Sequence, residues 1–93
     1  MQQPVALQTN KVIIMTDKQK KEQVEYYLGT GNVLKSCVWM DDINSVCVVH
    51  RASDKITPYV RWWFNHESPG FFWGHYFTEL DDAIADMVKT IGR

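Results

Sequence analysis

The chain has 93 residues, of which 45% are hydrophobic and 23% are charged, and its formal net charge is −1. This composition excludes a disordered chain and predicts one small domain spanning residues 1–93. The near-neutral charge disfavours nucleic-acid binding, because proteins of that class usually carry a basic surplus that neutralises phosphates.

The N-terminal segment predicts little regular structure. Residues 1–10 are polar, contain Pro4 and show no hydrophobic period, so we interpret them as a loose arm. Residues 11–15 (KVIIM) predict either a first strand or an extended lead-in to the core. This end lacks the apolar run of a signal peptide, and no window has the length of a membrane span. We therefore expect a cytoplasmic protein that does not enter a membrane.

A first helix is predicted over residues 17–28 by signals at both of its ends. Thr16 is a favourable N-cap, and Gln19 stands three residues later, which completes a capping box. Gly29 follows the last apolar residue, as is typical of a helix C-terminus. The apolar residues of its second half share one face, so we expect that half to pack on the rest of the domain.

Two β-branched runs, residues 33–40 and 45–51, predict a hairpin around a polar turn. A three-residue loop at 41–43 places Cys37 opposite Cys47. This register also gathers apolar residues on one face of the hairpin, namely Leu34, Val38, Met40, Val46 and Val48.

The two cysteines are interpreted as small core residues. Their spacing to His50 matches no zinc pattern, so neither a metal site nor a cofactor is predicted. A disulfide between Cys37 and Cys47 is geometrically allowed, but it is not expected in a reducing compartment.

Residues 56–65 and 71–77 predict a third and a fourth strand, separated by the turn sequence HESPG. Gly74 stands inside the fourth strand and indicates a bulge or a close backbone approach. A last helix is predicted over residues 79–91, with Thr78 as its N-cap, an acidic first turn and apolar residues at helical spacing.

These elements predict an α+β fold of the order (β)αββββα. The simplest assembly is a mainly antiparallel, four-stranded meander with the helices at 17–28 and 79–91 on the same face. That arrangement leaves the other face of the sheet without a helical cover.

Nine aromatic residues lie between Tyr59 and Phe77, more than two helices can cover on one face. Alternation along the third strand sends Tyr59, Arg61 and Trp63 to one face. Exposed Trp, Tyr and Arg side chains are typical of protein-binding hot spots. We predict a binding surface formed by Trp39, Tyr59, Arg61, Trp63, Phe72 and Tyr76.

The alternative interpretation of these rings is packing alone, since cross-strand aromatic pairs stabilise a sheet by roughly 0.2–1 kcal/mol each.

The functional hypothesis is a small non-enzymatic binding or regulatory protein that contacts a protein partner or a second copy of itself. Its size and charge suit an inhibitor or adaptor of the kind found in phages and mobile elements. One alternative is nucleic-acid binding, in which bases stack on the aromatic face and Lys35, Arg51 and Arg61 contact phosphates. A second alternative is an enzyme. Its chemistry is unknown because the sequence contains no catalytic motif, and His75 is the candidate catalytic residue.

Overall fold

The computed structural model describes residues 15–92, which form two helices and one four-stranded antiparallel sheet. The elements are, in chain order, α3 (Asp17–Leu28), β1 (Asn32–Trp39), β2 (Asn44–Arg51), β3 (Tyr59–Asn65), β4 (Gly70–Phe77) and α4 (Leu80–Ile91). The strands pair in sequence order as a meander, so the predicted class and the order αββββα are confirmed. The predicted arm 1–10 lies outside the described residues, and so does the predicted strand at 11–15 except for Met15, which belongs to no helix or strand.

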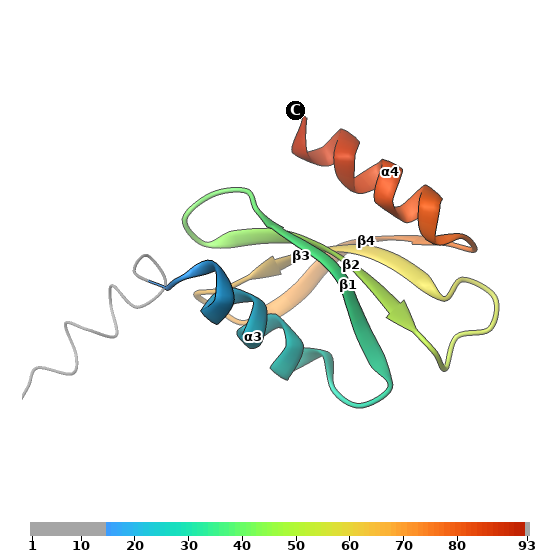
Figure 1. The fold of residues 1–93 in the computed structure, drawn as a ribbon, viewed down its shortest axis with the longest axis horizontal. Coiled ribbons are helices and arrows are strands. Elements are labelled where there is room, and N and C mark those ends of the chain that lie inside the picture. Colours follow the sequence, from blue (N-terminus) through green and yellow to red (C-terminus); the bar gives the residue numbers. More distant parts are fainter. Residues whose placement is uncertain (1–14, 93) are drawn as a thin grey trace, which may run out of the picture.

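The two helices cover opposite faces of the sheet (Figure 1), so the prediction that both lie on one face is wrong. The reason is the central strand β2, whose successive side chains point to opposite faces. Cys47 and Val49 belong to the core beneath α3, whereas Val46 and Val48 belong to the core beneath α4. All four are fully buried, so each face requires a cover. We call these faces the α3 face and the α4 face.

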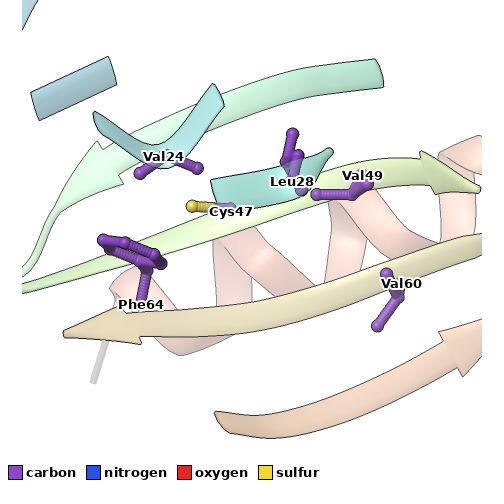
Figure 2. Packing of buried hydrophobic residues seen from close by; sticks show 6 residues of the cluster. All are labelled: Val24, Leu28, Cys47, Val49, Val60 and Phe64. Atoms are coloured by element: carbon purple, nitrogen blue, oxygen red, sulfur yellow. The ribbon is translucent and has the colours of Figure 1, made fainter. Parts of the chain in front are cut away.

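On the α3 face, the helix begins at the predicted capping box. The Gln19 amide donates to Thr16 Oγ1 at 3.1 Å, and the Thr16 amide donates to Gln19 Oε1 at 2.9 Å. About two turns further along the helix, apolar side chains reach the sheet. The resulting core (Figure 2) consists of Val24, Leu28, Cys47, Val49, Val60 and Phe64.

On the α4 face, Ala83 and Met87 pack on the side chains of β2. The helix begins one residue later than predicted, with Glu79 rather than Thr78 at the N-cap, because Phe77 still pairs in the sheet. Each of the two helices has 12 residues, and within residues 15–92 none has the length and hydrophobicity required to cross a membrane.

The β1–β2 hairpin has the predicted register near its turn, with Cys37 opposite Cys47. A bulge at Lys35 then shifts the ladder by one residue, since Leu34 pairs with Val49. The sequence predicts Leu34 on what is the α4 face. The bulge places it instead in the core beneath α3.

The β3–β4 ladder contains the bulge that Gly74 predicts. Two residues of β4, Trp73 and Gly74, oppose the single residue Trp62 of β3. A Cβ atom at Gly74 would lie only 2.6 Å from Nε1 of Trp62. The indole ring therefore occupies the space that any side chain at position 74 would need.

We expect Gly74→Ala to lower the free energy of unfolding by roughly 1–3 kcal/mol, because the added methyl group displaces the Trp62 ring. Urea denaturation followed by tryptophan fluorescence measures this loss. Gly70→Ala is the matched control in the same strand, since its Cβ would meet nothing closer than Ser68 O at 3.9 Å. Equal stabilities of the two variants would contradict the close approach described above.

Candidate binding surface at the β4 bulge

The six residues predicted to form one binding surface are divided between the two faces of the sheet. Trp39 lies beneath the Lys20 ammonium of α3, and Tyr76 meets the ring of Trp62, so both are on the α3 face. The other four lie on the α4 face, namely Tyr59, Arg61, Trp63 and Phe72. A single surface made from all six residues is therefore excluded.

The bulge explains why Phe72 and Tyr76 separate, although simple alternation places them on the same face. The extra residue in β4 reverses the alternation between them. Phe72 pairs with Trp63, and their rings stack with centroids 6.2 Å apart. Tyr76 pairs with Val60 on the opposite face.

Arg61 is buried rather than presented to a partner, with an exposed fraction of 4%. Its Nε donates to Asp86 Oδ2 of α4 at 2.7 Å, and its Nη1 donates to the carbonyl oxygen of Trp73 at 3.2 Å. Its Nη2 lies 2.9 Å from Nδ1 of His75. A buried charge is tolerated when it is paired and hydrogen-bonded in this way. Arg61 thus links the bulge of β4 to α4 through these hydrogen bonds.

Asp86 completes this network from the helix side. Burial raises the pKa of its carboxyl group, but the contacts with Arg61 and His75 outweigh burial and hold the pKa below its ordinary value. The His75 Nδ1 atom lies 3.1 Å from the same carboxylate oxygen. Asp86 therefore remains ionised at neutral pH and keeps the guanidinium of Arg61 paired.

A hollow of about 430 Å³ opens on the α4 face above this network. The bulge of β4 and the last turn of α4 contribute to its walls. Its lining combines aromatic rings and a thioether with the polar groups of the network, and consists of Met40, Arg61, Trp63, Trp73, His75 and Thr90. We call these six residues the Trp73 surface.

Trp73 dominates this surface, because 74% of it is exposed. Its backbone has a φ of 52°, a left-handed conformation that is strained for a bulky residue and costs roughly 1–3 kcal/mol. Its ring stands edge-on to Trp63, with centroids 6.4 Å apart. The fold thus holds a large apolar ring in water on strained backbone, a combination that is concentrated at functional sites. The binding surface predicted from the sequence does not include Trp73. The neighbouring Gly74 indicated a bulge, and the bulge is what exposes the Trp73 ring.

A second hydrogen-bonded set resembles a catalytic arrangement, but it lies in the interior. Ser45 Oγ is 2.7 Å from His66 Nε2, and His66 Nδ1 is 2.7 Å from Gln23 Oε1. An amide oxygen only accepts, so Nδ1 carries the proton and Nε2 accepts the bond from the serine hydroxyl. However, Ser45 is fully buried and His66 is only 2% exposed. Because this serine is closed off from a substrate, we interpret the hydrogen bonds of Ser45, His66 and Gln23 as a structural link between the sheet and α3.

Within residues 15–92, no three His, Cys, Asp or Glu side chains are grouped in a way that could hold a metal ion. Comparison of the chain with models of protein families, with curated proteins and with solved structures finds no match.

The buried His66 predicts a pH dependence of stability. Burial, together with the nearby Lys20 charge, lowers the pKa of His66 from 6.5 to about 4. Between these values the unfolded chain binds a proton that the folded chain does not bind. The free energy of unfolding should therefore fall by roughly 3 kcal/mol as the pH drops from about 6.5 to about 4.

Urea denaturation at a series of pH values measures this slope. His66→Gln is the matched variant, because it removes the titrating group, and its stability should change much less over the same window. Equal slopes for the two proteins would show that His66 is not the group responsible.

Proposed function

We propose that the protein is a small non-enzymatic binding protein that recognises another protein through the Trp73 surface. The observation that carries this proposal is the exposed indole of Trp73, held beside the hollow by strained backbone and by Arg61. A regulatory role fits this proposal, either as an inhibitor or as an adaptor of the phage or mobile-element type, and we place that role in the cytoplasm.

The energetics favour an interface at this point. Burying an exposed tryptophan in a partner's pocket is among the most favourable single contacts of protein interfaces and contributes about 2 kcal/mol or more. The ring of Trp73 already packs against Trp63 and Phe72, so it loses little conformational freedom on binding. The hollow in turn accepts a side chain of the partner.

The charges around the hollow indicate the chemistry of that partner. Asp86 of α4 contacts Arg61 in the lining of the hollow, and Asp82 stands one helical turn before Asp86 on the same side of that helix. The charges of Arg61 and Asp86 cancel each other, which leaves the carboxylate of Asp82 as the acidic group beyond this pair. We therefore infer a partner that inserts an apolar side chain into the hollow and places a basic residue near Asp82.

The same charges favour a protein partner over a nucleic acid. Of the cations that the nucleic-acid alternative requires, Arg61 pairs with Asp86 and Arg51 pairs with Asp54, each at 2.7 Å. Phosphates would also approach the carboxylate of Asp82, which is unfavourable. Nucleic-acid binding and self-association are the two alternatives that the experiment below distinguishes from binding to another protein.

Trp73→Ala should weaken binding to a peptide partner at least about tenfold while leaving the folded protein as stable as before. Little burial is lost when an exposed ring is removed, and the backbone strain at position 73 is smaller for alanine. The probe is a random peptide library displayed on phage and selected on the wild-type protein. Isothermal titration calorimetry then measures the affinity of each enriched peptide for the wild type and the variant.

Tyr26→Ala is the matched control, because Tyr26 is an aromatic residue that is 80% exposed on α3, away from the hollow. The proposal requires enriched peptides with an apolar residue next to Lys or Arg, and it requires their affinity to depend on Trp73 but not on Tyr26. Equal losses in both variants would contradict it. Salt-sensitive binding of a single-stranded oligonucleotide, lost on Trp73→Ala, would favour the nucleic-acid alternative. A dimer seen by light scattering, lost in the same variant, would favour self-association.

A further inference from the structure

A pair of thiols lies on the α3 face, on the other side of the sheet from the Trp73 surface. Cys37 belongs to the edge strand β1, and Cys47 stands directly opposite it on the central strand β2. Both thiols are free, and the Cys47 thiol donates a hydrogen bond to Cys37 Sγ with the sulfur atoms 3.5 Å apart. The two sulfur atoms therefore touch without being bonded.

The two cysteines differ sharply in their access to solvent. Cys47 is fully buried beneath α3, whereas Cys37 is only partly buried. Cys37 also lines a hollow of about 610 Å³ together with polar and charged side chains of α3, among them Asp17, Lys18 and Lys21. A small reagent dissolved in water thus meets Cys37 before the fully buried Cys47.

The hydrogen bond between the thiols and the charges near them also distinguish the two cysteines. The hydrogen bond from Cys47 lowers the pKa of the Cys37 thiol, burial opposes this effect, and the positive charge of Lys21 supports it. The hydrogen bond and burial both raise the pKa of the Cys47 thiol. A thiolate is the nucleophilic form of cysteine, so Cys37 is the more reactive of the two.

We propose that Cys37 and Cys47 form a peroxide-reactive pair, in which Cys37 is oxidised first and Cys47 then closes a disulfide with it. This proposal does not depend on the function proposed for the Trp73 surface. It modifies the expectation that the thiols are merely core residues. A transient disulfide formed by an oxidant is compatible with a reducing compartment, where persistent disulfides are rare.

The chemistry needs a hydroperoxide as the oxidant and proceeds in two steps. The Cys37 thiolate attacks the terminal peroxide oxygen, the O–O bond breaks, and the leaving oxygen takes a proton and departs as water or an alcohol. The Cys47 sulfur then attacks the sulfenic acid on Cys37, the S–O bond breaks, and the hydroxide leaves with the Cys47 proton as water. Overall, two thiols and one peroxide give one disulfide, one water and one water or alcohol.

The strand geometry permits this bond. Residues directly opposite each other in an antiparallel ladder have Cα atoms about 4.5–5.5 Å apart, within the range of about 4.4–6.8 Å that disulfides span. The product would fasten the edge strand β1 covalently to β2 beneath α3.

The test treats the folded 93-residue protein with hydrogen peroxide and follows it by mass spectrometry without reduction. The wild type should lose both free thiols together, with a mass decrease of two hydrogen atoms that dithiothreitol reverses. In Cys47→Ser, oxidation should stop at a Cys37 sulfenic acid that dimedone traps. In Cys37→Ser, oxidation of Cys47 should be at least about tenfold slower, because the remaining thiol is buried.

Circular dichroism first establishes that the variants are folded, and Cys47→Ala replaces Cys47→Ser if the serine hydroxyl is not tolerated in the core. The proposal is overturned if the wild type forms no intramolecular disulfide at peroxide concentrations that oxidise free glutathione. It is also overturned if Cys47 reacts as fast in Cys37→Ser as in the wild type, or if the disulfide links two molecules.

Discussion

The burial of the central strand β2 on both of its faces is the constraint on which the rest of this structure depends. The side chains of residues 46–49 alternate between the faces, and none of them is exposed. Within residues 15–92 the chain supplies one short helix for each face. α3 lies nearest to β1, whereas α4 lies across β2, β3 and β4. Each helix therefore covers a different part of the sheet. Aromatic rings occupy the areas that each helix leaves open, as Trp62 and Tyr76 do on the α3 face.

The buried charge of Arg61 joins three elements that would otherwise have separate roles. Its guanidinium contacts the carboxylate of Asp86 on α4, the backbone of Trp73 at the bulge and the ring of His75 on β4. Because each contact uses a different nitrogen atom of one planar group, a movement of α4 would disturb all of them together. The Trp73 surface is therefore as rigid as the packing of α4 on the sheet. A rigid surface loses little conformational entropy on binding, so any conformational adjustment would occur in the partner.

Local signals in the sequence predicted the local features, and long-range contacts decided the rest. The capping box at Thr16, the register at Cys37 and the bulge at Gly74 each depend on neighbouring residues, and each is confirmed. The bulge at Lys35 has no glycine to indicate it. The opposite placement of the helices follows from residues 46–49 of β2, which are apolar on both sides, and this pattern favours a cover on both faces of the sheet. In the site, one inserted residue separated Phe72 from Tyr76. The pairing of Arg61 with Asp86, 25 residues away, could not be read from any local pattern.

The bulge in β4 also affects how this strand could pair with strands of other molecules. β4 is an edge strand of an open sheet, and a regular edge offers its free backbone groups as a template for strands of other molecules. Here the repeat is broken at Trp73, whose carbonyl oxygen is turned inward to the guanidinium of Arg61. A foreign strand aligned on β4 would lose its pairing at that point. The irregularity that displays the indole thus also makes β4 a poor template for the addition of a strand from another molecule.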